Sequence, residues 1–207
     1  MRSYDIWKRA FDLCGATLLL AVTLPLWVVA AVAVLLTQGP PILYRQQRVG
    51  RNGRPFTLRK FRTMRDAPPE QLIDRPVART FEEHRATPLG QLLRRTALDE
   101  LPQLLNVLRG EMSLVGPRPL PVEDLQQRDW LTQVSEDERA RRLEWRERRQ
   151  QVLPGLTGLW QITPNPAEDF ANWIASDLHY VDARSVLLDL RILLATPYAV
   201  LRGRKSR

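Results

Sequence analysis

The sequence Leu98-Asp99-Glu100-Leu101-Pro102-Gln103 places two adjacent carboxylates where a helix is expected to begin. With Asp99 as the N-cap, Pro102 falls in the first turn, where its missing N–H costs little because N–H groups there have no helical partner. Leucines then recur at helical spacing as far as Leu108, and Gly110 is a suitable C-cap. We therefore expect a short helix with both carboxylates at its start.

Two interpretations of this carboxylate pair remain open. Asp99 and Glu100 are sufficient as a cap and as a complement to the helix macrodipole, with no chemical role. However, Arg94 and Arg95 precede them closely, and Arg118 follows between two prolines that restrict its backbone. Acidic residues, a helix N-terminus and arginine forks gathered at one place suit a phosphate ester and a divalent cation.

The composition limits the classes of protein and partner. The 207 residues, 44% of them apolar, are enough for one modest domain and an embedded segment. The chain has 31 basic and 23 acidic residues, a formal charge of +8, which favours anionic partners such as phosphates, nucleotides, nucleic acid or an acidic membrane surface. Cys14 is the only cysteine, so no intrachain disulfide forms, in keeping with a reducing compartment.

A membrane segment is the strongest compositional prediction. No residue between Leu13 and Leu43 carries a formal charge, and the apolar run to Leu36 is long enough for a helix to cross a bilayer. It is too long for a signal peptide, and no clear small-residue cleavage site follows it. We therefore expect residues 1–43 to form a membrane part and residues 44–207 to form a cytoplasmic domain on the membrane surface.

The path of this segment through the membrane depends on Pro25, which removes a helical hydrogen bond to Ala21 and predicts a break or kink. Both flanks of the segment are basic, and the positive-inside rule favours such flanks on the cytoplasmic side. A re-entrant helix satisfies both flanks. A single span remains the alternative, because the short N-terminal tail also carries Asp5 and Asp12.

The segment that follows is strongly basic. Residues 44–65 include no acidic residue, and the turn signal Gly50-Arg51-Asn52-Gly53 lies between two runs that suit strands. This predicted hairpin suits either a phosphate cradle or a surface held against anionic headgroups. Residues 67–85 are expected to be a polar loop with no chemical role.

Three further helical segments are predicted. Thr87-Pro88 is typical of an N-cap and first helical residue, opening a short helix that carries Arg94 and Arg95. Residues 122–150 carry charge of both signs and indicate solvated helices, in which Trp130 and Trp145 are expected to be packing or interfacial residues. Residues 186–194 form an amphipathic pattern before a basic tail, which suits a helix on the membrane. The fold class is therefore mainly α with short β elements (α+β).

Several short motifs, in order along nearly the whole chain, resemble those of the small monotopic phosphoglycosyl transferases of the bacterial sugar transferase family. Together they are far more specific than any one of them. The matching stretches are Lys8-Arg9-Ala10-Phe11-Asp12, Phe61-Arg62-Thr63-Met64, Leu98 to Gln103, Gly116 to Pro119 and Gly155 to Gln161.

The resemblance implies a reaction. Such enzymes transfer a sugar 1-phosphate from a nucleotide diphosphate sugar, here by resemblance a UDP-sugar, to polyprenyl (undecaprenyl) phosphate at the cytoplasmic face of the bacterial inner membrane, and so initiate surface glycan or exopolysaccharide assembly. It implies that Asp99 is the nucleophile, forming a phosphosugar-aspartyl intermediate, and that Glu100 binds Mg²⁺. The candidates for binding substrate phosphates are Arg94, Arg95, Arg118, Lys60 and Arg62.

The chain departs from the family pattern at three places. The family breaks its re-entrant helix at a Ser-Pro pair, whereas this chain has Thr23-Leu24-Pro25. Glu83 and His84 lie in a stretch where the family tends to have other residues, so they receive no role. No Gly-Arg follows Gln161-Ile162, which leaves selection of the sugar and nucleotide open.

Two other classes of function are compared with the enzyme on the same residues. A nucleic-acid-binding protein is disfavoured, because the aromatic residues do not alternate with basic ones and no helix-turn-helix or zinc pattern occurs. A non-catalytic membrane scaffold that binds anionic lipid headgroups remains an alternative to the enzyme. A homodimer is compatible with this sequence.

Overall fold

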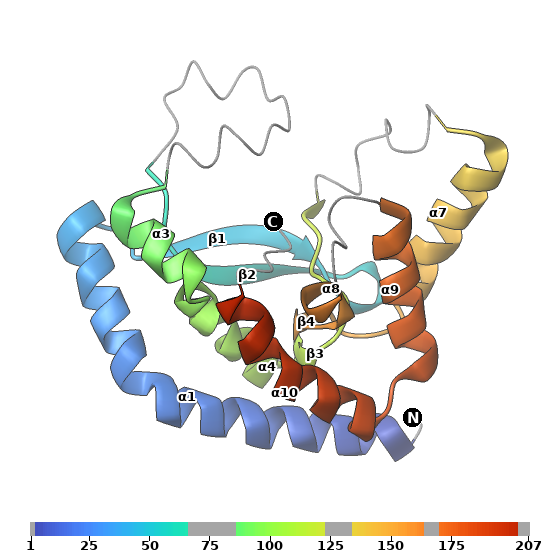
Figure 1. The fold of residues 1–207 in the computed structure, drawn as a ribbon, viewed down its shortest axis with the longest axis horizontal. Coiled ribbons are helices and arrows are strands. Elements are labelled where there is room, and N and C mark those ends of the chain that lie inside the picture. Colours follow the sequence, from blue (N-terminus) through green and yellow to red (C-terminus); the bar gives the residue numbers. More distant parts are fainter. Residues whose placement is uncertain (1–2, 66–85, 123–133, 164–169, 203–207) are drawn as a thin grey trace.

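The computed structural model describes residues 3–65, 86–122, 134–163 and 170–202. Within these residues the protein is mainly helical with four short strands, as the sequence predicted (Figure 1). In chain order the elements are α1 (Ser3–Gln38), β1 (Leu43–Val49), the 3-10 turn η1 (Arg51–Gly53), β2 (Pro55–Phe61), α3 (Pro88–Arg95), the 3-10 helix η3 (Leu98–Gln103), α4 (Leu104–Arg109), β3 (Ser113–Val115), α7 (Glu136–Arg149), β4 (Gly155–Thr157), α8 (Leu159–Ile162), α9 (Phe170–Ala183) and α10 (Val186–Leu201).

Helix α1 is the longest element, and it continues through Pro25 without interruption. Figure 1 shows that it changes direction about midway, so Pro25 accompanies a bend and not a break in the helix. The Thr23 hydroxyl donates to the carbonyl of Leu19 at 2.6 Å. It therefore does not bond the carbonyl of Ala21, which the proline leaves without its usual helical donor.

Both ends of α1 lie against the same body of the protein. Near its beginning, Arg9 donates to the carbonyls of Val107 and Leu108 at 2.7 and 2.9 Å. At its end, the Gln38 amide donates to the carbonyl of Arg62 at 3.0 Å. Because the helix bends between these two attachments, its middle projects away from the domain while its ends do not (Figure 1).

The basic hairpin predicted from the sequence is confirmed. Strands β1 and β2 pair antiparallel, with Tyr44 opposite Lys60 and Arg48 opposite Phe56. Asn52 and Gly53 adopt positive φ angles in the connection, which is the conformation that this residue pair favours. Phe56, Leu58 and Lys60 lie on the same face of β2 because side chains alternate along a strand. Phe56 and Leu58 are buried in the core.

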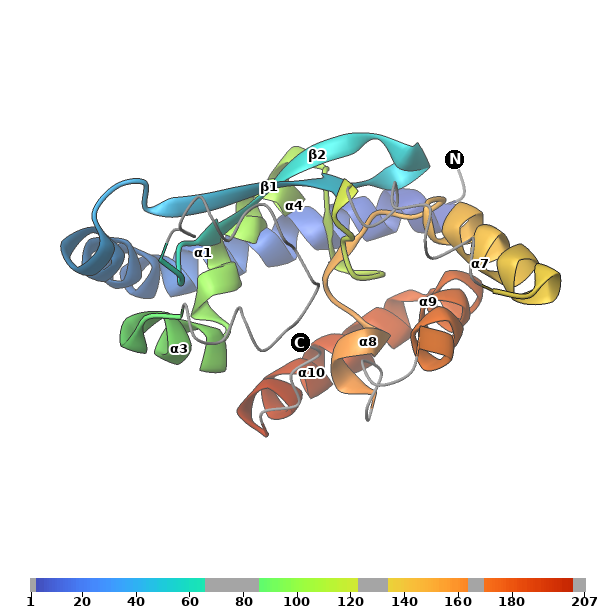
Figure 2. The ribbon, with the colours of Figure 1, turned by 90° about the horizontal axis from the view of Figure 1, so that it is seen from above.

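The main core lies between the hairpin, α4, α10 and the first half of α1. Its fully buried side chains include Leu58, Leu104, Leu114 and Ile192, and Ala16 of α1 is part of it. Figure 2 shows α1 passing behind the hairpin and α4, with α10 on the opposite side of the molecule. The second sheet pairs β3 and β4 in parallel, so it brings Ser113 beside Gly155 and Val115 beside Thr157.

The prediction that Asp99 is an N-cap was wrong. The N-cap residue of η3 is Ala97, in a left-handed conformation with φ of 55°, and no side chain caps this turn. Asp99 instead lies within the first turn of the 3-10 helix, which continues into α4 and ends at Gly110 with φ of 79°. The C-cap prediction for Gly110 is thus confirmed, as is the Thr87 cap, whose hydroxyl accepts from the Gly90 N–H at 2.9 Å.

Several sequence predictions fall outside the described residues. These are the polar loop at 67–85 with Glu83 and His84, Trp130 with its flanking helix, and the basic tail after Arg202. Trp145, in contrast, is described and is fully buried, as predicted for a packing residue.

Candidate active site

The two carboxylates of η3 lie beside the end of the hairpin. Lys60 on β2 places its Nζ 2.5 Å from Glu100 Oε1, and both side chains remain about a quarter to a third exposed. Because residues opposite each other in an antiparallel pair share a face, Arg48 lies on the same face as Lys60, whereas Arg45 and Arg59 lie on the other. The pleat of the hairpin therefore selects which of its many cations reach the carboxylates.

Asp99 is buried, with 8% of its surface exposed, and it forms no ion pair with the described residues. Burial and the neighbouring Glu100 charge raise the pKa of Asp99 to about 7, while Lys60 and Arg94 act in the opposite direction. A carboxylate with a raised pKa is more basic than an ordinary aspartate, and it is free of a tightly bound cation. Both properties suit a nucleophile.

Glu100 has the opposite electrostatic balance. Burial acts to raise its pKa, but the charge and hydrogen bond of Lys60, with the charges of Arg118 and Arg48, lower it. Glu100 thus stays ionised when Asp99 is not. The pair divides into one carboxylate held by cations and one that is left available.

Arg94 and Arg118 come to this site from different elements. Arg94 lies at the end of α3, whose start packs so closely on Thr63 that a Cβ on Gly90 would approach the Thr63 carbonyl oxygen to 1.9 Å. Arg118 follows β3, and its guanidinium lies 5.0 Å from the centre of the Trp160 ring. The structure therefore gathers Asp99, Glu100, Lys60, Arg94 and Arg118, as the sequence predicted.

Two predicted phosphate ligands form no ion pair with these carboxylates within the described chain. Arg62 donates to the carbonyls of Gln38, Gly39 and Pro40, so its guanidinium holds the end of α1. Arg95 is exposed on α3 and forms no ion pair with the carboxylates within the described chain. The Phe61-Arg62-Thr63-Met64 motif is thus explained by packing: Phe61 is buried, Arg62 binds α1 and Thr63 supports α3.

One further cation of the site, Arg48, was not among the ligands predicted from the sequence. Arg48 acts on Glu100 and donates to the Pro119 carbonyl at 2.8 Å, which ties β1 to the Arg118 loop. The alternation of strand residues, counted back from Lys60 across the turn, would have placed Arg48 on the same face.

The Lys8-to-Asp12 motif has a structural place. Lys8 bridges Asp12 and Asp189 at 2.9 and 3.1 Å, and Asp12 also accepts from Ser113 and from the Leu114 N–H. These buried contacts join α1 to β3 and α10. The motif therefore fixes the start of α1 against the strand that leads to Arg118.

A metal cage made of protein side chains alone is not present in the described part of the chain, where no group of three His, Cys, Asp or Glu side chains occurs. The residues present still fit Mg²⁺, because this ion keeps several waters and commonly binds through one or two carboxylates together with substrate phosphates. Glu100, the predicted ligand, is such a carboxylate.

An apolar surface covers the outer sides of α1 and α10. By length and composition, α1 is the one described helix that could cross a membrane, and only 11% of its most apolar stretch is buried in the protein. The large apolar side chains exposed on these two helices include Trp7, Leu18, Val22, Val29, Leu36, Leu187, Leu194 and Leu201. Exposed apolar side chains gathered on helices in this way are typical of a membrane contact.

Comparison with known proteins identifies the family. The family described as "Bacterial sugar transferase" matches residues 3–203. The chain is 41% identical over 199 residues to the "Uncharacterized sugar transferase EpsL" of Bacillus subtilis, covering 95% of this chain and 88% of the relative. It is 38% identical to the "Exopolysaccharide production protein ExoY" of Sinorhizobium fredii, with 97% and 88% covered.

A relative with a more specific name is the "UDP-glucose:undecaprenyl-phosphate glucose-1-phosphate transferase" of Caulobacter vibrioides. It is 38% identical over 200 residues, which cover 93% of this chain and 68% of the relative. Since the family match spans nearly the whole chain, the protein belongs to the bacterial sugar transferase family.

Proposed function

We propose that this enzyme transfers a sugar 1-phosphate from a UDP-sugar to undecaprenyl phosphate through a covalent intermediate on Asp99, and so initiates assembly of a surface glycan or exopolysaccharide. The observation that carries the proposal is the division of the carboxylate pair: Glu100 is bound by Lys60, whereas Asp99 is buried, unpaired among the described residues and raised in pKa. The name of the Caulobacter relative supports the donor and acceptor classes.

In the first step, an oxygen of Asp99 attacks the phosphorus that bears the sugar. The bond from that phosphorus to the nucleotide's bridging oxygen breaks, and UMP leaves with the electron pair. In the second step, an oxygen of undecaprenyl phosphate attacks the same phosphorus, which returns Asp99 to a carboxylate and gives undecaprenyl diphosphate sugar. Two displacements through a carboxylate replace one between two large anions.

The cations have defined tasks in these steps. Arg94 and Lys60 lie where they stabilise the ionised form of Asp99, and Arg118 supplies a fork to the phosphate oxygens. Since Lys60 bonds Oε1 of Glu100, we assign Oε2 of Glu100 as the oxygen that would hold Mg²⁺. When bound, Mg²⁺ neutralises negative charge on the diphosphate.

We also propose that α1 is re-entrant and that the domain lies on the cytoplasmic face of the inner membrane. Both ends of α1 attach to one body through Arg9 and Gln38, and a bend lies between them. A straight span would carry one of these attachments across the bilayer. The basic hairpin beside the end of α1 suits the cytoplasmic side.

The test is release of UMP from a panel of UDP-sugars by the full chain in detergent, with Mg²⁺ and undecaprenyl phosphate. Wild type is expected to release UMP from one sugar, and Asp99→Asn is expected to lose essentially all turnover because an amide cannot form the acyl phosphate. Glu100→Gln should also lose most turnover and need more Mg²⁺. Absence of release by folded wild type would instead favour a scaffold that binds lipid headgroups.

A further inference from the structure

The loop that carries Arg118 is held by an unusual set of hydrogen bonds. Five successive carbonyl groups, from residue 116 to residue 120, each accept from a different donor. The donors, in order, are the Trp160 indole, the Gly155 N–H, the Arg149 guanidinium, the Arg48 guanidinium and the Val49 N–H. Because these hydrogen bonds hold five successive carbonyl groups, the backbone that carries Arg118 has little freedom to move.

Arg149 is the member of this set with the most elaborate support. It ends α7, is 7% exposed, and donates to the Arg118 carbonyl. Its Nε lies 3.3 Å from Asp177 of α9, and its guanidinium lies 4.6 Å from the centre of the Trp145 ring. Trp145 in turn donates to Asp177 at 3.0 Å. Two side chains, Trp145 of α7 and Asp177 of α9, thus fix one guanidinium.

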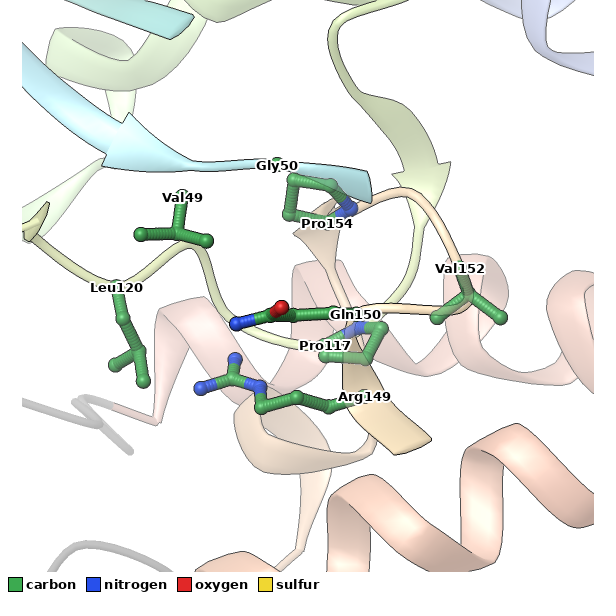
Figure 3. Close-up of a pocket in the computed structure, with 8 residues that line it drawn as sticks. All are labelled: Val49, Gly50, Pro117, Leu120, Arg149, Gln150, Val152 and Pro154. Atoms are coloured by element: carbon green, nitrogen blue, oxygen red, sulfur yellow. The ribbon is translucent and has the colours of Figure 1, made fainter. Parts of the chain in front are cut away.

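Figure 3 shows where this guanidinium lies. Arg149 borders a small pocket with Gln150 and Pro117, while Val49, Gly50, Leu120, Val152 and Pro154 form the rest of its walls. Asp99 and Glu100 are not among the lining residues. Arg149 therefore contacts the Arg118 loop beside a pocket that the two carboxylates do not line.

On the catalytic side, the Arg118 guanidinium is supported by the Trp160 ring, and its charge acts on Glu100. Glycines at 155 and 158 let the β4 segment lie against Gly116, because a Cβ on either would come within 2.2 Å of a Gly116 backbone atom. The loop is thus held both by backbone contact with the β4 segment and by the Arg149 guanidinium.

We propose that Arg149 is a positioning residue that acts through Arg118: it holds the Arg118 loop so that the guanidinium faces the substrate phosphates beside Glu100. The inference rests on the proposed function for its substrate. It does not require Arg149 to touch the substrate.

The test uses Arg149→Met together with Asp177→Asn in the full chain in detergent. Changing both residues avoids leaving one buried charge unpaired, and the amide oxygen still accepts from Trp145. We expect a protein of nearly wild-type melting temperature whose kcat/KM for the UDP-sugar falls about tenfold to a hundredfold, because small misplacements of a phosphate ligand are costly. Asp177→Asn alone should retain most activity.

The matched control is Arg148→Met. Arg148 is the preceding residue of α7 and binds Glu144 and Asp182 on the surface, so kinetics should stay within about twofold of wild type.

A double-mutant cycle separates positioning from general damage. In an Arg118→Ala background, the Arg149 and Asp177 changes should reduce kcat/KM no further than about twofold, because the residue through which they act is gone. Losses that multiply would overturn the inference, as would wild-type kinetics of the folded Arg149 variant.

Binding of inorganic pyrophosphate with Mg²⁺, measured by calorimetry, gives a second readout that does not need turnover. Wild type should bind pyrophosphate more tightly than Arg118→Ala and the Arg149 variant, and the latter two should bind alike. Equal binding by all three, or none by wild type, would overturn the inference. If the expected differences in pyrophosphate binding are found but wild type turns over no UDP-sugar, only the proposed function is overturned.

Discussion

Lys60 Nζ and Glu100 Oε1 lie 2.5 Å apart, and this contact joins the hairpin to the 3-10 helix that carries both carboxylates. Its effect differs for the two acids. Lys60 lowers the pKa of Glu100 and so holds it ionised. The negative charge of Glu100 in turn raises the pKa of the neighbouring Asp99. Lys60 therefore affects the pKa of both Asp99 and Glu100.

The pH dependence of the reaction should show the raised pKa of Asp99. Because only the carboxylate attacks phosphorus, kcat/KM should rise with pH and level off above about 7. Lys60→Met should lower kcat/KM at least about tenfold and move this acid limb to higher pH, because Lys60 lowers the pKa of both carboxylates.

The control for Lys60→Met is Arg54→Met, which removes an exposed cation at the turn of the same hairpin. Its profile should match wild type. An unchanged acid limb in Lys60→Met would contradict the assignment of that limb to Asp99.

Asp99 should also make stability depend on pH. Its folded-state pKa lies above the unfolded value, so the folded state binds the proton more tightly. Its contribution to the free energy of unfolding is complete below about pH 4 and is lost as the pH rises through about 7. Asp99→Asn should therefore be more stable than wild type at pH 8, by about a few degrees in melting temperature.

The measurement is thermal unfolding in detergent at pH 5 and pH 8 for both proteins. The advantage of Asp99→Asn should shrink at pH 5, where wild-type Asp99 is protonated. An advantage that grows toward acid would refute the raised pKa.

Arg62 should be important for folding and not for phosphate binding. Arg62→Met removes the donor to three carbonyls at the end of α1, which should cost about 1–3 kcal/mol of stability. The kcat/KM of the folded fraction should stay within about threefold of wild type. A lower melting temperature with nearly normal kinetics is the expected pattern, and normal stability with a large rise in KM would restore Arg62 to the phosphate site.

The re-entrant path of α1 can be tested by labelling. In a Cys14→Ser background, Ser3→Cys and Asn52→Cys place single thiols before and after the membrane helix. An impermeant maleimide added to inside-out vesicles should label both, and one added to right-side-out cells should label neither. Labelling of the two positions from opposite sides would establish a straight span instead.

Much of the local structure followed from the sequence because its causes are local. The hairpin follows from two strand-forming runs around Asn52-Gly53, and the start of α3 follows from Thr87-Pro88. Gly110 ends α4 because a left-handed residue is needed there. Ala97 takes the same conformation without the usual glycine, so the true start of η3 gave no signal, and Asp99 was mistaken for the cap.

The sequence alone thus identified the two carboxylates and predicted that cationic residues lie near them. Adjacent acids, nearby arginines and an uncharged helix can all be read along one chain. The tertiary structure alone decided which cations serve the site. Lys60 and Arg48 reach Glu100 because strand pleating puts them on one face, whereas Arg62 is turned to the end of α1. Arg149 meets the Arg118 carbonyl across 31 residues of chain, so only tertiary packing brings the two together.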